Sequence, residues 1–333
     1  MHYPRMRLAL LLLPLLLSCA PEQASAQNFQ LPIDCAVGEV CVVQNYADLD
    51  PNNGAADDPR CGPFTYDGHD GLDIRAPQAL ADRGVAVLSP AAGVIAAVRD
   101  GEPDGAFLQG GMAAIDNREC GNGVRIDHDG GWSSQLCHMR RGSLRVREGD
   151  RVEAGQTLGL IGLSGHTEFP HIHITLRLND NRVEPVTGQS LGGVRCGDDV
   201  EPGAIWSAQA RQALAYRGAQ WFAAGFTGSA PGEGANAEAL PANAARTSDA
   251  LVFYGLAIGP RDGDILRVRL YAPDGSLVGE NTRTQPRDQA QAWLFTGRRT
   301  PSGGWAAGDY RGEAVLLRDG RPVQTRTEAI TLR

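Results

Sequence analysis

Five side chains that can bind a metal ion or transfer a proton occur in three short motifs. The first motif, GHDGLD, contains His69 and, four residues later, Asp73. The second motif, CHM, contains His138, and the third, PHIHI, contains His171 and His173. Imidazole and carboxylate groups are common ligands of zinc, so the three motifs together predict a metal site.

The third motif lies in HIHITLRL, a run typical of a β-strand. Side chains alternate between the two faces of a strand, so His171 and His173 are expected to emerge on the same face. Two imidazoles on one face bring polar nitrogens that need partners, and a metal ion meets that need. A catalytic zinc ion commonly takes three protein ligands and leaves a position for water. His69, Asp73 and one histidine of the pair would supply three ligands, and Gly71 permits a sharp turn between the first two.

Four other polar or sulfur-containing features are expected to be structural. His128 follows the run GVRID and is expected to be solvated or locally hydrogen-bonded rather than metal-bound. His166 lies in the loop-like run LSGHTEFP and would contact a substrate only at the rim of a site. The acidic stretch 48–58 lacks the spacing and closing Glu of a calcium loop, which favours a solvated turn. By strand alternation, Cys137 is expected to point away from the neighbouring His138 and to form a disulfide.

The cysteines indicate an oxidising compartment. Of the seven, six follow residue 30 and form an even set, which favours disulfides. Six cysteines allow 15 pairings, and the sequence alone does not select one of them. Two pairs have a geometric basis and leave a third: Cys35–Cys41 across a short loop, Cys120–Cys137 across a hairpin, and Cys61–Cys196 between the two ends of the first domain.

The first 26 residues resemble a secretory signal. Two arginines precede the apolar run Leu8–Leu17, which is shorter than the roughly 20 residues that span a bilayer. Ala24-Ser25-Ala26 is a cleavage pattern that would release a soluble protein beginning at Gln27. LLSC, ending at Cys19, resembles a lipobox, in which that cysteine would be lipidated. We therefore expect an exported protein, periplasmic or secreted, with lipid anchoring through Cys19 as the alternative and no transmembrane helix.

Composition excludes several other classes of protein. The chain has 333 residues with 42 Gly and 20 Pro, which favours turn-rich β structure and more than one domain. Its formal net charge is −8, and every basic residue apart from histidine is arginine. An acidic chain without a basic block is a poor candidate for binding nucleic acid or an anionic membrane surface.

The elements that position the three motifs read as short antiparallel strands. Between Gly84 and Val186, β-rich runs alternate with Gly, Asp and Asn turns. The stretch Asp100–Glu119 interrupts this rhythm with Gly and Ala and is expected to be a loop. Residues 205–222 have helical character, and the Ala-, Gly- and Pro-rich segment after them is expected to be a linker. From Ala250 onward, about seven short strands suggest a small immunoglobulin-like sandwich.

The three motifs, in this order, resemble the lysostaphin/LytM-type zinc metallopeptidases, which cleave peptide cross-links in bacterial cell walls. The intervening runs SPAAGVIAAVRD, GNGVRIDHDGGWSSQLCHM and VREGDRVEAGQTLGLIGLSG resemble strands, hairpin and turn of the same family. The resemblance covers roughly residues 62 to 186 and does not extend to the C-terminal domain. It implies an antiparallel β fold of the duplicated-hybrid-motif type with an open groove.

The resemblance also assigns roles to individual residues. It implies one zinc ion held by His69, Asp73 and His173, with His138 and His171 as catalytic residues. Two positions depart from the family pattern. Leu136 stands where the family often has Tyr, and Phe169 stands where Gly usually precedes Pro-His; both are expected to alter the groove.

The expected domains are a signal peptide (1–26), an N-terminal extension (27–61), a metallopeptidase domain (62–198), a helical segment and linker (199–249) and a β-sandwich (250–333). The expected function is zinc-dependent hydrolysis of peptide bonds in peptidoglycan stem peptides or cross-links. The sandwich would position the enzyme or bind a protein partner. Two alternatives stay open: a non-catalytic wall-binding regulator of another hydrolase, and a metalloprotease acting on extracellular proteins.

Overall fold

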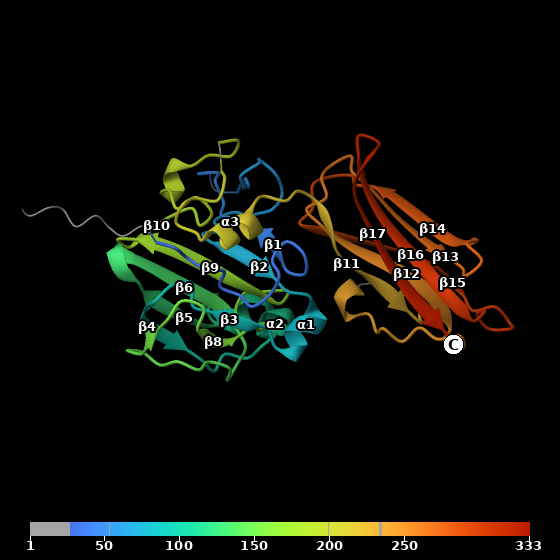
Figure 1. Cartoon of the computed structure of the whole chain (residues 1–333), viewed down its shortest axis with the longest axis horizontal. Coiled ribbons are helices and arrows are strands. Elements are labelled where there is room, and N and C mark those ends of the chain that lie inside the picture. The colour runs from blue at the N-terminus through green and yellow to red at the C-terminus, as the bar shows by residue number, and fades with distance from the viewer. Residues whose placement is uncertain (1–26, 53, 199, 233–234) are drawn as a thin grey trace, which may run out of the picture.

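The computed structural model describes residues 27–333 except 53, 199 and 233–234. The expected signal peptide and Cys19 lie outside the described residues. We call residues 27–214 the N-terminal domain and residues 220–333 the C-terminal domain. Both are mainly β, as expected, and lie side by side in Figure 1. In the described part of the chain, no helix has the length and apolar character needed to cross a membrane.

The N-terminal domain is built on one antiparallel sheet. Two adjacent strands near one edge of this sheet, β2 (Leu72–Arg75) and β9 (His171–Leu178), pair with each other; the first motif ends in β2 and the third begins β9. A two-stranded sheet of β3 (Ala86–Leu88) and β8 (Thr157–Leu160) lies beside it. The main sheet has the spatial order β1 (Val42–Asn45), β2 (Leu72–Arg75), β9 (His171–Leu178), β6 (Trp132–Met139), β5 (Asn122–Asp127), β4 (Gly93–Arg99) and β7 (Arg151–Val152), with β10 (Asn181–Arg182) also paired to β9.

Strand alternation separates the apolar core from the polar face of this sheet. On β2, Leu72 and Ile74 are buried in the core, and on β9 Ile172 and Ile174 join them. The residues between these positions are Asp73, Arg75, His171 and His173, which therefore share the opposite face. The register pairs Asp73 with His173 and Arg75 with His171. Pairing of β2 with β9 thus brings the first and third motifs together.

Three α-helices and three 3-10 helices complete the described structure. They are α1 (Gln78–Arg83), α2 (Ala106–Ile115), α3 (Ala208–Leu214), η1 (Asp129–Gly131), η2 (Leu191–Gly193) and η3 (Ala237–Ala239). The expectation that residues 100–119 form a loop is wrong, because α2 lies within them. Its Ala, Leu, Gln and Met residues favour helix, whereas Gly110 and Gly111 disfavour it, and the helix is kinked at Gly111.

The six cysteines of the described chain form three disulfides, all in the N-terminal domain. The pairs are Cys35–Cys41, Cys120–Cys137 and Cys61–Cys196. The second links the two ends of the β5–β6 hairpin, and the third spans 135 residues of sequence. The first two are the pairings that loop and hairpin geometry favoured, and the third is the pairing that they leave.

The C-terminal domain is a sandwich of two antiparallel sheets around an apolar core. In chain order, its first, second and fifth strands form one sheet, and its third, sixth and seventh form the other, with the fourth beside the third. This is an immunoglobulin-like arrangement in which the fourth strand has joined the second sheet. The sheets are β11 (Gln220–Thr227), β12 (Ala250–Ile258) and β15 (Gln291–Arg299), and β14 (Leu277–Thr284), β13 (Ile265–Tyr271), β16 (Gly308–Arg318) and β17 (Arg321–Leu332).

The sandwich begins earlier in the chain than position 250. Strand β11, inside the segment read as helix and linker, pairs with β12 along its whole length. Its residues Ala223, Ala224 and Gly225 have low β propensity, so pairing with β12 rather than local preference makes this segment a strand. Only residues 208–214 of the expected helix are helical.

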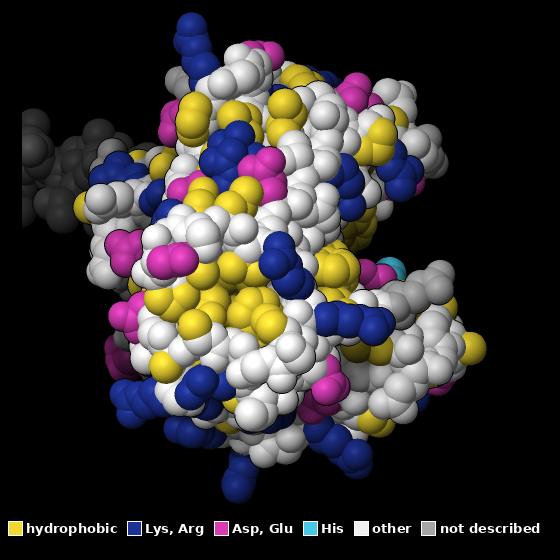
Figure 2. All heavy atoms as spheres, turned by 90° about the vertical axis from the view of Figure 1, so that its right-hand side faces the viewer, with side chains coloured by type: hydrophobic (Ala, Val, Ile, Leu, Met, Phe, Trp, Pro, Cys, Tyr) yellow, Lys and Arg dark blue, Asp and Glu magenta, His cyan; other side chains and the backbone are white. Residues whose placement is uncertain are grey.

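The outer end of the C-terminal domain has hydrophobic, basic and acidic side chains on one surface (Figure 2). Figure 2 shows hydrophobic side chains gathered on this face, with arginines and acidic groups scattered around them. Leu277, Phe295 and Val323 are among the exposed apolar residues of the domain. The arginines on this face do not form a single block.

Candidate metal centre

Three atoms from distant segments converge at the polar face of β2 and β9. The Nε2 of His69 lies 3.1 Å from the Oδ1 of Asp73 and 3.1 Å from the Nδ1 of His173. That Nδ1 lies 2.8 Å from the same Oδ1. Tetrahedral zinc with bonds of about 2.0–2.1 Å separates its ligand atoms by roughly 3.3 Å. The three atoms therefore have nearly the spacing that one zinc ion requires.

Hydrogen bonds orient each of the three side chains. The Nδ1–H of His69 donates to the Tyr46 carbonyl oxygen at 2.6 Å, which leaves the Nε2 lone pair free. The Nε2 of His173 lies 2.9 Å from the Thr175 hydroxyl, so its Nδ1 faces the centre. Asn45 donates to the second oxygen of Asp73 at 2.9 Å. These contacts are the orienting shell that metal ligands in proteins normally have.

Gly71 provides space rather than a turn. A Cβ at this position would lie 2.4 Å from the Cε1 of His173 and 2.8 Å from the Ile174 carbonyl oxygen. Real Cβ contacts are not this short, so any side chain at position 71 would displace the His173 ring. The expectation that Gly71 serves a sharp turn is replaced by this packing requirement, because its φ is not in the left-handed region.

The buried charges of the centre favour a cation. Burial alone would raise the pKa of Asp73, but His69 and His171 beside it hold that pKa well below its usual range. Burial alone would lower the pKa of His173, but hydrogen bonds to Asp70 and Asp73 raise it to about 9. A carboxylate that stays ionised thus faces an imidazole that holds a positive charge. Metal binding would displace that proton, as is usual for histidine ligands.

His138 and His171 stand together beside the three converging groups. Their ring centroids are 4.6 Å apart. The Nδ1–H of His138 donates to the Ser164 carbonyl oxygen at 2.9 Å, and that of His171 donates to the Phe169 carbonyl oxygen at 3.0 Å. Because both Nδ1 atoms are used as donors, the Nε2 of His138 is a free acceptor, whereas the Nε2 of His171 faces the carboxylate of Asp73. The Nε2 of His171 lies 3.5 Å from the Oδ1 of Asp73.

The backbone of His138 is in the left-handed region, with φ of 64°. A non-glycine residue rarely adopts this conformation, and such strain concentrates at functional sites. It also breaks strand alternation, so Cys137 and His138 line the same cavity rather than opposite faces, contrary to the expectation. Cys137 is bonded to Cys120 and so offers no thiolate. Burial, reinforced by His171 and His173, lowers the pKa of His138 well below its ordinary value, so this imidazole is neutral at pH 7.

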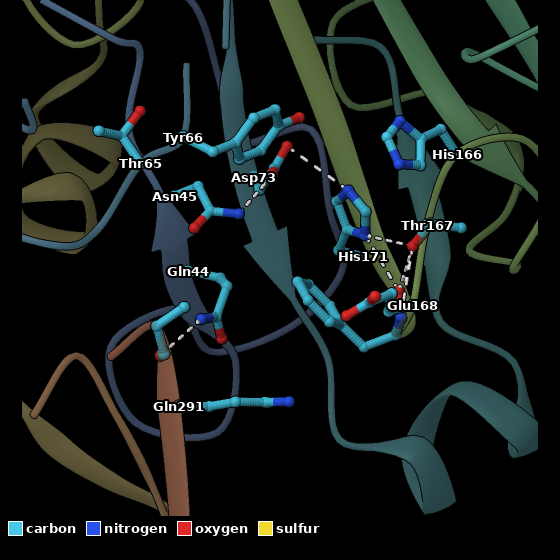
Figure 3. Close-up of a pocket in the computed structure, with 12 residues that line it drawn as sticks. Gln44, Asn45, Thr65, Tyr66, Asp73, His166, Thr167, Glu168, His171 and Gln291 are labelled. Carbon is cyan, nitrogen blue, oxygen red and sulfur yellow. Dashed lines mark hydrogen bonds and ion pairs between the residues drawn. The ribbon is translucent and has the colours of Figure 1, made fainter. Parts of the chain in front are cut away.

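Two cavities of about 280 Å³ each flank the centre. The first, which we call the His171 cavity, contains Asp73 and His171 in its wall (Figure 3). The second, the His138 cavity, contains His138 and His173. Tyr66 and His166 line both, so the two cavities form one groove that passes the centre. Nothing in the sequence pattern singled out Tyr66. His166, for which a surface loop was the preferred interpretation, is exposed and contributes to the walls of both cavities.

The remaining polar groups have structural roles. His128 is buried and bonded to the Ala92 carbonyl oxygen and the Ser134 hydroxyl, so it is locally hydrogen-bonded rather than metal-bound. The acidic stretch 48–58 was expected to be a solvated turn, but its last residue is not solvated. Asp58 is fully buried and accepts from backbone amides, including that of Gly62, and from the Tyr216 hydroxyl.

Comparison with known proteins agrees with this geometry. Residues 67–185, which contain all three motifs, match the model of peptidase family M23. This segment is a peptidase family M23 domain.

Two curated relatives are similar to part of this chain. The cell division protein DipM of Caulobacter vibrioides is 31% identical over 109 residues, which are 33% of this chain and 14% of that protein. The peptidoglycan DD-endopeptidase ShyC of Vibrio cholerae is 34% identical over 82 residues, 23% of this chain and 18% of that protein. The chain thus spans less than a fifth of the length of either relative.

Solved structures to which part of this chain is similar include the catalytic domain of lysostaphin from Staphylococcus simulans. It is 19% identical with a TM-score of 0.29, and the match covers 42% of this chain and 85% of that one. The catalytic domain of EnpA from Enterococcus faecalis is 24% identical with a TM-score of 0.31, over 49% and 95% of the two chains.

Proposed function

We propose that this protein is an exported, zinc-dependent endopeptidase that hydrolyses peptide bonds in peptidoglycan stem peptides or their cross-links. The observation that carries this proposal is the convergence of His69 Nε2, Asp73 Oδ1 and His173 Nδ1, separated by 2.8–3.1 Å. A peptidase family M23 domain over the same residues supports it. Two imidazoles and one carboxylate form a ligand set that suits zinc and leaves a fourth position open.

The chain's own residues supply positioning and proton transfer. Zinc held by the three ligands would lower the pKa of a bound water to about 7 and polarise the scissile carbonyl. His138 is neutral at pH 7 with a free Nε2, so it can accept a proton during attack. The Nε2 of His171, which faces the carboxylate of Asp73, can hold a proton and return it to the leaving amine. Once protonated, either imidazole can stabilise negative charge that develops on the carbonyl oxygen.

The wall substrate is supported by the relatives rather than by the site. ShyC is by its name a peptidoglycan DD-endopeptidase, and the resemblance to lysostaphin/LytM-type enzymes points to the same class of substrate. Export is supported by the three disulfides and by the signal-like first 26 residues. Anchoring through Cys19 is the alternative to release as a soluble protein.

The test combines metal content with mass spectrometry of released wall fragments. Purified protein should contain one zinc per chain and release cross-link or stem-peptide fragments from peptidoglycan. His173→Ala should lose both zinc and activity, whereas His171→Ala should keep zinc and lose activity. A zinc-free wild type that binds wall would favour the non-catalytic regulator. A zinc-loaded wild type that digests extracellular protein but not wall would favour the alternative of a metalloprotease that acts on extracellular proteins.

A further inference from the structure

The His171 cavity has walls from both domains. Gln44 and Thr65 of the N-terminal domain lie on one side, and Ala290 and Gln291, at the start of β15, close another side. Figure 3 shows the Gln291 side chain lying along the cavity below Gln44, with Glu168 above it and His171 farther along. The C-terminal domain therefore reaches the space next to a residue of the proposed catalytic set.

A buried arginine fixes this wall in place. Arg75 lies two residues after Asp73 on β2, and it forms an ion pair with Glu238 in which both side chains are at most 5% exposed. It also donates to Gln44 Oε1 at 3.0 Å and to Gln291 Oε1 at 2.9 Å. The amide of Gln44 in turn donates to the backbone oxygen of the residue before Gln291 at 3.2 Å. A buried, multiply bonded arginine of this kind holds its partners in one geometry.

Phe169, the departure from the family's Gly-Pro-His pattern, belongs to the same arrangement. Its ring lies 4.2 Å from the Arg75 guanidinium, and Phe222 of the C-terminal domain lies 4.8 Å from the same group. Cation–π contacts of this kind stabilise a desolvated arginine. The carbonyl of Phe169 accepts the Nδ1–H of His171. The residue that positions His171 therefore also packs against the arginine that holds Gln291.

The two domains are in close apolar contact around this point. Phe222, Leu256 and Ile258 of the C-terminal domain are part of the same buried cluster as the core of the N-terminal domain. A Cβ at Gly259 would lie 1.8 Å from the ring of Phe64, so glycine alone permits this approach. Such packing makes Ala290 and Gln291 a fixed wall of the cavity rather than a tethered surface.

The polar groups of the cavity indicate what it would bind. Gln291 uses its Oε1 for Arg75, which leaves its Nε2 as a donor for a peptide carbonyl. Apart from Asp73 and the histidines, Glu168 is the only ionisable carboxyl or basic group in the wall, and it is exposed. The His138 cavity differs, because its wall carries both signs of charge: Asp70 and Glu119 contribute to it as well as Arg177 and Arg182. Among the described residues of the His171 cavity wall there is no arginine, so the exposed carboxylate of Glu168 is available to a positively charged group.

On the basis of the proposed function, we propose that the C-terminal domain forms part of the substrate-binding groove. Gln291 and Ala290 close a subsite beside His171 that holds the peptide on one side of the scissile bond. Glu168 in that subsite favours a residue that carries a free ammonium group. The sandwich is then a determinant of cross-link specificity and not only a module that positions the enzyme.

The experiment compares Gln291→Trp with Thr282→Trp in the full chain. Thr282 is an exposed residue of β14 outside the cavity and is the matched control. With a cross-linked dimeric wall peptide, Gln291→Trp should lower kcat/KM by about tenfold or more through KM, equivalent to about 1.4 kcal/mol. Zinc content and circular dichroism should stay unchanged, and Thr282→Trp should match the wild type. Gln291→Ala, which cannot overfill the cavity, should give a smaller loss.

The charge preference is tested with the same peptide in free-amine and N-acetylated forms. Wild type should prefer the free amine, and Glu168→Gln should reduce that preference by about tenfold, the contribution of a charged hydrogen bond. If wild type hydrolyses wall peptides and Gln291→Trp and Glu168→Gln behave identically to it, the groove assignment is wrong although the proposed function stands.

If wild type hydrolyses no wall peptide, the proposed function fails separately. Calorimetric titration of the dimeric peptide into His171→Ala, with and without Gln291→Trp, then decides the groove assignment. Weaker binding with Gln291→Trp supports the assignment, and equal binding or none overturns it.

Discussion

Strand alternation buries different kinds of side chain in the two domains. In the C-terminal domain the inward positions are apolar, as in Leu266, Val268 and Leu270 of β13, and they fill one core between two sheets. In the N-terminal domain, β2 and β9 bury both faces, and one of those faces carries the ionisable groups of the candidate metal centre. Burying such groups costs free energy unless each finds a partner.

The disulfides are also distributed unequally between the two domains. The three disulfides all lie in the N-terminal domain, and the sequence contains no cysteine after position 196. The C-terminal domain instead has the longest strands, β16 with 11 residues and β17 with 12. In the N-terminal domain, buried ionisable groups take the place of apolar contacts, and disulfides add stability. The C-terminal domain has uninterrupted apolar layers and is stable through packing alone.

Loss of a metal ligand should produce the largest effect and should be confined to the N-terminal domain. His173→Ala removes one of the three converging atoms, so zinc should be lost and wall hydrolysis should fall below detection. Metal analysis and muropeptide mass spectrometry measure both. His128→Gln is the matched control, since His128 is a buried histidine outside the centre. Retention of stoichiometric zinc by His173→Ala would contradict the ligand assignment.

Replacement of a proton-transfer residue should separate chemistry from metal binding. His138→Ala should lower kcat by roughly 10²–10⁴-fold, the usual contribution of general acid–base catalysis. Zinc content should remain that of the wild type, because His138 is not among the converging ligand atoms. A variant that loses zinc as well would mean that His138 belongs to the ligand set.

Removal of the long-range disulfide should destabilise one domain more than the other. The variant Cys61→Ser/Cys196→Ser opens a link across 135 residues, for which chain entropy predicts a loss of about 4–5 kcal/mol. Hydrogen exchange should then accelerate in β2, β9 and β6, while β13, β16 and β17 keep their protection. Equal acceleration in both domains would show that they unfold as one cooperative unit.

The pH dependence of catalysis should show the smallest effect. Burial lowers the pKa of His138 well below its ordinary value of about 6.5, so the neutral form persists as the pH falls through that value. The acid limb of the kcat profile should therefore lie below pH 6.5, with zinc content measured at each pH. An acid limb above pH 6.5 in zinc-loaded enzyme would exclude His138 as the group that must be neutral.

Much of the centre could be predicted because its logic is local. His171 and His173 share a face by strand alternation alone, and the HxxxD spacing of the first motif pointed to His69 and Asp73, the other two proposed ligands. Thr175, two residues beyond His173, lies on the same face by the same rule and could have been found. The cross-strand cysteines were predictable for a similar reason, since they flank one hairpin.

The parts that sequence reasoning missed depend on contacts between distant segments. Asn45, which orients Asp73, comes from β1, and no spacing rule connects the two. Strand β11 is made by pairing with β12 rather than by its own residues, which are small. Glu238 lies in a segment rich in Ala and Gly that offered little to bury, yet its side chain neutralises Arg75. Long-range pairing and buried charge partners are set by the assembled fold and leave no periodic trace.

The Cys61–Cys196 bridge encloses all five residues of the proposed site between its two ends. A protease that cuts an exposed loop inside this span would therefore nick the chain without separating the halves. On an electrophoresis gel such a nicked molecule should migrate at full length until a reductant is added, and it could remain assembled and active.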